Sequence, residues 1–223
     1  MGKECFNCKE FYEEKLELKP QVSVDKVNYE EFKYQLDTFE EWLYFNLDNE
    51  HPVSGTIDNV KPFFKKIIRQ KGEKLIFTGF LLTFKRLFVG MDTLDDLTFI
   101  HISKQAQERH QFRAGDRIEA HATMRLEGGR LIFNGLHHIQ IEKKGTGYLW
   151  NNSKAMVINK SATTFHNQPD GCIECPFGML VDVEYENTRQ GKSKHLVCLK
   201  GIQDYRQCHQ RAEFCYSDLI KKS

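Results

Sequence analysis

The stretch from Arg117 to Leu126, RIEAHATMRL, alternates polar and apolar side chains more regularly than any other part of the chain. Successive side chains of a strand point to opposite faces, so this alternation predicts a β-strand with one buried face. Glu127-Gly128-Gly129 follows and predicts a hairpin turn. The chain then returns as a second strand from Arg130 to Ile141, in which Gly135 marks a bulge or bend.

The preceding residues show the same two-residue period. It predicts strands over 75–82, 87–91 and 97–102, followed by a short helix over 103–112 with Ser103 as its N-cap. The order is therefore strand, strand, strand, helix, strand, strand, with Gly115-Asp116 opening the fourth strand and Gly128-Gly129 joining the last two. This order resembles the OB-fold, and the resemblance implies a five-stranded OB-like β-barrel over residues 71–145.

Upstream of the strands, apolar side chains recur at helical spacing. The pattern predicts a helix over 28–47 and a second over 59–70, separated by the turn-rich segment 51–55. Downstream, a Cys-rich turn precedes a hairpin formed by 179–186 and 195–199; residues 156–158 suit a short strand and 204–220 a helix. We therefore expect an α+β protein with three parts: 1–70, an N-terminal Cys knuckle and helices; 71–145, the OB-like barrel; and 146–223, a C-terminal zinc-ribbon-like hairpin module.

The cysteines are the strongest chemical signal in the chain. There are seven, an odd number, and four of them form the pairs Cys5/Cys8 and Cys172/Cys175, each with two intervening residues. Two cysteines at this spacing grip one metal ion from a tight turn, and tetrahedral zinc takes four Cys or His ligands. Cys172-Ile-Glu-Cys175-Pro-Phe-Gly178 followed by a hairpin resembles a zinc ribbon. We expect Zn²⁺, with an iron–sulfur cluster as the alternative that cysteine ligands equally allow.

The grouping of these ligands has two solutions. In the local one, Cys172, Cys175, Cys198 and Cys208 hold one ion, and Cys5, Cys8, His209 and Cys215 hold another. In the shared one, Cys5, Cys8, Cys172 and Cys175 surround a single ion and join the two ends of the chain. Cys198 alternates with Leu196 on a predicted strand, so it is also a candidate core cysteine.

Composition limits the class of protein. The chain has 223 residues, 40% hydrophobic and 28% charged, with a net charge of +1. It contains no apolar run near the ~18 residues of a membrane helix and no secretory signal at its start. Cysteines at metal-ligand spacing without export signals favour a reducing compartment, so we expect a cytoplasmic protein with no membrane partner.

No catalytic motif is recognisable. The chain lacks a metalloprotease spacing, a nucleophile elbow and a phosphate-binding glycine loop. The histidines of the predicted strands, His101, His121 and His137-His138, are interpreted as polar surface residues. We therefore expect a non-enzymatic protein, with an enzyme that has no local motif as a further alternative.

The resemblance to an OB-fold also implies a ligand surface. That surface is the face of the second and third strands with the loops beside it, where cations and aromatic rings are interleaved. Here the corresponding residues are Phe84, Lys85, Arg86, Phe88, Phe99, His101, Arg125 and Arg130. We expect them to bind RNA or single-stranded DNA as an accessory to a larger nucleoprotein machine. A protein–protein adaptor with structural metal sites, which would have protein partners, is the alternative.

Overall fold

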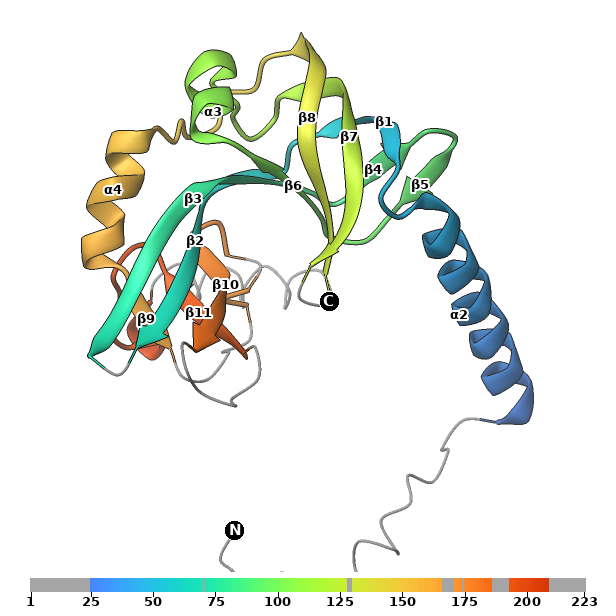
Figure 1. Ribbon diagram of the computed structural model, residues 1–223, viewed down its shortest axis with the longest axis horizontal. Helices are drawn as coiled ribbons and strands as arrows, with labels where there is room; N and C mark the ends of the chain where they lie inside the picture. Colours follow the sequence, from blue (N-terminus) through green and yellow to red (C-terminus); the bar gives the residue numbers. More distant parts are fainter. Residues whose placement is uncertain are drawn as a thin grey trace, which may run out of the picture. The chain divides into compact units, whose positions relative to one another are not determined.

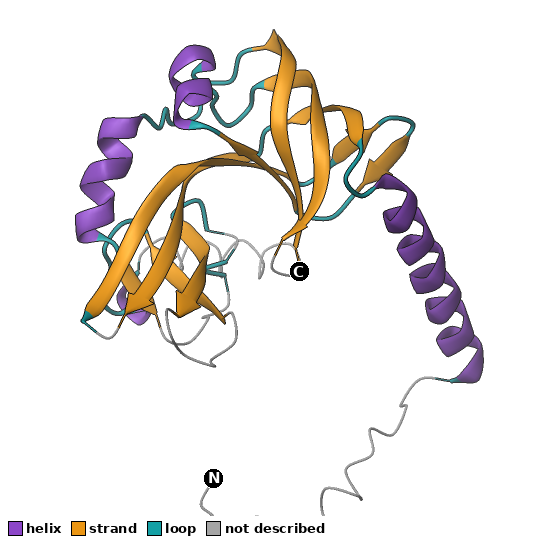
Figure 2. Ribbon diagram, in the orientation of Figure 1, coloured by secondary structure: helices purple, strands orange, loops and turns teal. Residues whose placement is uncertain are grey.

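A computed structural model describes residues 25–69, 71–127, 130–165, 171–173, 175–185 and 193–208. The chain divides into two units, one ending at Asn46 and one beginning at Leu47. The elements of the second unit are mostly strands (Figures 1 and 2), with bounds β1 (Glu50–Thr56), β2 (Asn59–Arg69), β3 (Gly72–Phe84), β4 (Leu87–Val89), β5 (Asp92–Leu94), β6 (Thr98–Ile102), α3 (Lys104–His110), β7 (Arg117–Glu127), β8 (Arg130–Lys143), α4 (Asn152–Ser161), β9 (Thr163–Phe165), β10 (Gly178–Tyr185), β11 (Ser193–Cys198) and the 3₁₀ turn η2 (Tyr205–Gln207).

The first unit contributes one described helix, α2 (Lys26–Asn46), where the sequence predicts a helix over 28–47. The helix begins two residues before its predicted start, and Asp25 caps it. The Asp25 carboxylate accepts a hydrogen bond from the Asn28 backbone N–H at 3.0 Å. Such a cap satisfies one of the free N–H groups of the first helical turn. No helix in the described ranges is long and apolar enough to cross a membrane.

The expected five-stranded barrel with a separate C-terminal hairpin is wrong. The described strands form one open sheet of eleven strands, in the order β5-β4-β1-β7-β8-β6-β3-β2-β10-β11-β9. Most neighbours are antiparallel, but β6 pairs with β8 and β2 with β10 in parallel. The β2–β10 pairing, from Asp182↔Lys65 to Tyr185↔Ile68, joins the predicted hairpin module to the main sheet. The expected boundaries between the three parts of the chain, near residues 70 and 145, stay predictions. Strands from all three parts belong to the same sheet.

The second expected N-terminal helix, over 59–70, is also wrong, because this segment is strand β2. Strand β1 occupies the segment for which a turn was predicted, and residues 156–158 lie in helix α4 instead of a strand. The side chain of Asn151 caps α4 by accepting from the Lys154 N–H at 2.9 Å. The predicted strands at 75–82, 87–91, 97–102, 117–126 and 130–141 all form, as do the helix at 103–112 and the hairpin. The predicted helix at 204–220 lies mostly outside the described residues.

The sheet is strongly curved around β1 and β2. These strands are separated in the chain by only Ile57 and Asp58, yet four strands lie between them in the sheet. Five strand spacings of a flat sheet span roughly 24 Å, whereas three Cα steps reach at most about 11 Å. The sheet must therefore bend back, and Figure 1 shows β2 and β3 arching toward β6, β7 and β8. Phe80, Phe84, Ile100, Phe112 and Phe133 are among the fully buried side chains that fill the core.

Candidate functional site

Four of the eight predicted metal ligands line one small cavity. Cys172 and Cys175 lie in the turn before β10, Cys198 ends β11, and Cys208 follows η2. The antiparallel pairing of β10 with β11 places Cys198 directly opposite Gly178, beside this turn. These four are the residues that the local grouping assigns to one ion. Cys5, Cys8, His209 and Cys215 lie outside the described residues, so the shared grouping stays a prediction.

The turn that carries the first two cysteines is held by its own backbone. The Cys175 N–H donates to the Gly171 carbonyl at 3.1 Å, and the Gly178 N–H donates to the Cys175 carbonyl at 2.9 Å. The Phe177 N–H points at the Cys175 sulfur, 3.5 Å away. A hydrogen bond from a backbone amide stabilises a thiolate over a thiol, and the thiolate is the form that binds metal.

The cavity among the four cysteines has a volume of about 20 Å³. This is room for one ion or one water molecule and for nothing larger. Apart from the cysteine sulfurs, its side chains are mainly apolar, with Phe165, Leu196, Val197 and Ile202 among them. A water molecule needs two to four polar partners, which this lining does not offer. In the described part of the chain, however, no three of the four sulfurs lie within 4.8 Å of one another.

Lys61 on β2 is hydrogen-bonded to the backbone of the cysteine turn. Its side chain is buried, and its Nζ donates to the carbonyl oxygens of Cys175 at 2.8 Å and Gly178 at 2.9 Å. Burial lowers the pKa of Lys61 to about 8, against the opposing attraction of Cys175 and Asp58. A buried ammonium that satisfies two backbone carbonyls connects β2 to the turn before β10.

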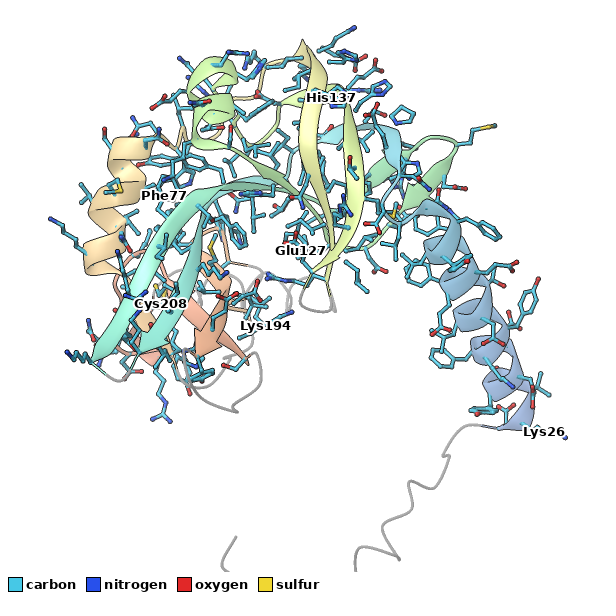
Figure 3. All side chains as sticks on the ribbon, viewed as in Figure 1. Lys26, Phe77, Glu127, His137, Lys194 and Cys208 are labelled. Carbon is cyan, nitrogen blue, oxygen red and sulfur yellow. The ribbon has the colours of Figure 1, made fainter. Side chains whose placement is uncertain are left out.

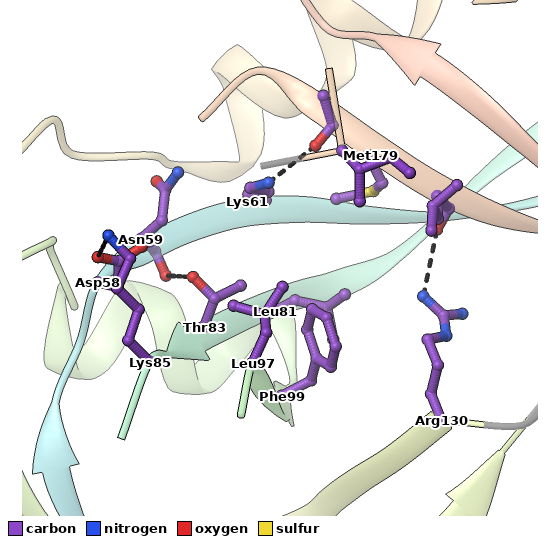
Figure 4. Close-up of a pocket in the computed structure, with 13 residues that line it drawn as sticks. Asp58, Asn59, Lys61, Leu81, Thr83, Lys85, Leu97, Phe99, Arg130 and Met179 are labelled. Carbon is purple, nitrogen blue, oxygen red and sulfur yellow. Dashed lines mark hydrogen bonds and ion pairs between the residues drawn. The ribbon is translucent and has the colours of Figure 1, made fainter. Parts of the chain in front are cut away.

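A larger pocket of about 290 Å³ adjoins this turn (Figure 4). It brings together three of the eight predicted nucleic-acid-binding residues: Lys85, Phe99 and Arg130. Lys61 and Gly178 also line it, so the cysteine turn forms part of its wall. The guanidinium of Arg130 lies 5.9 Å from the centre of the Phe99 ring, within the range of a cation–π contact.

The other five predicted residues lie elsewhere. Phe84 is fully buried in the core, and His101 lines a different pocket with Phe63 and Lys194. Phe88 and Arg86 border a third pocket beside β1. All four predicted cations are paired with aspartates: Lys85 with Asp58, Arg86 with Asp95, Arg125 with Asp48, and Arg130 with Asp182. The positive charge expected for phosphates is thus largely neutralised in the free protein.

Sequence reasoning missed one cluster. Among the residues that the structure describes, His121, His137 and His138 are the one group of three or more potential metal ligands whose donor atoms all lie within 4.8 Å of one another. The sequence places His121 on one strand and His137-His138 on the next, but strict alternation puts neighbouring residues on opposite faces. The sequence therefore shows three histidines on neighbouring predicted strands. That their side chains converge depends on how the two strands pair, which the sequence does not show.

Comparison with protein-family models, curated proteins and solved structures gives no match for this chain. Function is therefore inferred from the geometry and chemistry of the described residues alone.

Proposed function

We propose that this chain is a zinc-containing protein that binds RNA or single-stranded DNA in the pocket beside the cysteine turn. The observation that carries the proposal is the convergence of Phe99, Arg130, Lys85 and Lys61 on that pocket. Single-stranded nucleic acid is bound by aromatic rings that stack on bases, next to cations that neutralise phosphates. The pocket volume of about 290 Å³ is near the lower end of the usual range for ligand sites.

Lys85 and Arg130 differ in exposure and in their ion pairs, and we therefore give them different roles in binding. The Lys85 side chain is 79% exposed and pairs with Asp58 at 3.1 Å. Exposed pairs of this kind contribute at most about 1 kcal/mol, so a phosphate can displace Asp58 at little cost. The Arg130 side chain is only 16% exposed and pairs with Asp182 at 2.7 Å. It keeps that pair and acts together with the Phe99 ring as the stacking surface for a base.

The metal has a structural role in this proposal. Gly178 lines both the pocket and the cysteine cavity, so the turn that zinc would hold is also a wall of the binding site. Four thiolates at one tetrahedral ion would fix Cys172, Cys175, Cys198 and Cys208 relative to one another. An iron–sulfur cluster is the alternative, but a cavity of about 20 Å³ favours a single ion.

The free thiols of Cys175, Cys198 and Cys208 support a reducing compartment, and we place the protein in the cytoplasm. In an oxidising compartment, cysteines grouped around one cavity would be expected to form disulfides. Reaction of the native protein with a thiol reagent before and after chelation of metal tests whether metal protects these cysteines. Cysteines that react only after chelation support a metal-protected thiolate cluster.

Fluorescence anisotropy with a labelled mixed-sequence oligonucleotide tests binding. Phe99→Ala removes one stacked base contact worth about 1–3 kcal/mol, so the Kd rises about 5- to 150-fold. Lys85→Ala removes one phosphate contact and reduces the salt slope of log K by about 0.7 between roughly 50 and 200 mM salt. Arg86→Ala and Arg125→Ala are matched controls, because each removes one aspartate-paired cation outside the pocket. The proposal is refuted by absence of binding at low salt, or by Arg86→Ala weakening binding as much as Phe99→Ala.

Elemental analysis of the purified chain tests the metal. We expect zinc, and we expect Cys172→Ser and Cys198→Ser each to lose it. Replacement of both Cys5 and Cys8 by Ser separates the two groupings. In the local grouping this variant keeps one of two zinc ions per chain, whereas in the shared grouping it loses the single ion. Iron with inorganic sulfide selects the cluster, and absence of any metal from all preparations removes the metal part of the proposal.

A further inference from the structure

The backbone of β8 changes direction around His137 and His138. Glu119 on β7 pairs with Gln140, His121 with His137, and Thr123 with Asn134. Each step advances two residues on β7 and three on β8, so β8 carries one extra residue on either side of His137. A bulge of this kind re-aims side chains, and bulges are common next to active sites.

Two residues with positive φ accompany the bulges. Gly135 has φ +70° and His138 has φ +50°. A left-handed conformation is uncommon for a residue other than glycine, and it persists where the surroundings hold it. In a regular strand, the adjacent side chains of His137 and His138 would point to opposite faces. Here their rings lie 4.7 Å apart between centres, and each lies within 6 Å of the His121 ring, at 5.8 Å and 5.6 Å.

From this convergence we propose that His121, His137 and His138 bind a divalent transition-metal ion of the zinc class. Their donor atoms all lie within 4.8 Å of one another. The nitrogens around one tetrahedral zinc ion lie about 3.3 Å apart, so the three rings would move closer together when they bind the ion. Neutral imidazole is the ligand that Zn²⁺, Cu²⁺ and Ni²⁺ share. Three protein ligands leave a fourth position open, as in sites that bind an exchangeable water.

The contacts of the His121 and His137 rings bear on which nitrogens bind the ion. His137 Nδ1 lies 2.8 Å from the Gly135 carbonyl oxygen, and His121 Nδ1 lies 3.2 Å from the Glu50 carboxylate. In metal sites, a histidine commonly donates one ring N–H to a carbonyl or carboxylate and binds the ion with the other nitrogen. The Nε2 atom of His121 is then its ligand. Both ring nitrogens of His137 face an acceptor, because its Nε2 lies 3.3 Å from the other Glu50 oxygen. An ion bound by His137 Nε2 would therefore replace this contact with Glu50.

The open side of the site faces a groove. A hollow of about 490 Å³ is lined by His121 and His138 together with Glu119, Gln140 and Phe88. A small polar ligand in this groove can reach the fourth position of the ion. The site is separate from the cysteine cavity, since Figure 3 shows His137 and Cys208 in well-separated parts of the sheet-containing unit.

Zn²⁺ titration of the full chain without a histidine tag, followed by calorimetry and by the ring ¹⁵N signals of the histidines, tests the site. We expect Zn²⁺ added to the protein as purified to bind and to shift the ring signals of these three residues. His121→Gln and His137→Gln should each weaken binding at least about 100-fold, beyond the 10- to 100-fold cost of losing an outer-shell partner. His110→Gln, a substitution in α3, is the matched control and should leave binding unchanged.

A second variant distinguishes zinc binding at the histidines from zinc binding at the cysteines. Cys172→Ser should leave the ring shifts of the three histidines intact, which shows that the two metal sites are distinct. Because the histidine side chains are at least partly exposed, the Gln variants are expected to fold, and far-ultraviolet circular dichroism checks this. Absence of ring shifts at about 0.1 mM Zn²⁺, or binding that is the same in His121→Gln and in the unmodified chain, overturns the proposal.

Discussion

The Gly178→Ala substitution tests the packing of the cysteine turn most directly. A β-carbon at this position would overlap the carbonyl oxygen of Cys172 and lie 2.8 Å from its carbonyl carbon. Carbon atoms pack at about 3.5–4.0 Å, so the two backbones must separate by at least about 0.7 Å. Metal–ligand distances tolerate changes of only about 0.2 Å. The substitution should therefore disrupt the cysteine cavity and the Lys61 hydrogen bond to the Gly178 carbonyl together.

The expected cost follows from these contacts. Overpacking costs about 1–3 kcal/mol, and a lost hydrogen bond from a charged donor adds about 1.5–3 kcal/mol. We expect the free energy of unfolding to fall by at least about 2.5 kcal/mol. For a chain of this length, that lowers Tm by at least about 5–10 °C. Urea unfolding followed by circular dichroism measures the first quantity, and elemental analysis shows whether metal is lost with it.

Gly171→Ala is the matched control in the same turn. Gly171 has φ +76°, and nothing lies within 4 Å of the added β-carbon. It should cost only the backbone strain of a left-handed residue, about 1–2 kcal/mol, and leave the cavity intact. If Gly178→Ala is no more destabilising than Gly171→Ala and keeps its metal, the close packing of Cys172 against Gly178 is wrong.

Two further substitutions test buried polar groups. Asp116 is fully buried and accepts hydrogen bonds from the backbone N–H groups of Arg113 at 3.0 Å and Gly145 at 2.7 Å. Asp116→Ala leaves both donors unsatisfied, so the free energy of unfolding measured in urea should fall by about 2–6 kcal/mol. A fall of less than about 1 kcal/mol would contradict this role of Asp116. Burial lowers the pKa of His101, with nearby Glu127 opposing the shift. The unfolded chain therefore binds the proton more readily, and stability should fall as the pH drops through about 6.5. His101→Phe should flatten that fall, and an unchanged pH profile would refute it.

The segment 59–70 shows why part of the sheet was not predictable. Phe63, Phe64, Ile67 and Ile68 occur as two adjacent pairs four residues apart, a spacing typical of a helix face. In the structure this segment pairs with β3 on one side and with β10 on the other. A register shift between Phe63 and Phe64 also breaks the two-residue alternation. The partner β10 is more than a hundred residues away, and no local pattern encodes that contact.

The candidate sites were predictable to different degrees. Cysteine spacing alone pointed to Cys172 and Cys175, and the hairpin that brings Cys198 next to them was also visible as two alternating strands. The histidine cluster was not, because the extra residues in β8 and the conformation of His138 depend on pairing with β7. The aspartate partners of Lys85 and Arg130 are separated from them by 27 and 52 residues, so the neutralised charge of the pocket could not be seen in the chain.

The edge strands of the eleven-stranded sheet affect how readily the protein aggregates at high concentration. Among the strands that the structure describes, the edge strands β5 (Asp92–Leu94) and β9 (Thr163–Phe165) are each three residues long. A long, flat outermost strand offers a row of unpaired backbone groups to a second molecule, and such rows seed amyloid-like association. Edge strands of three residues offer few such groups. We therefore expect little edge-to-edge association between the sheets of different molecules at these strands.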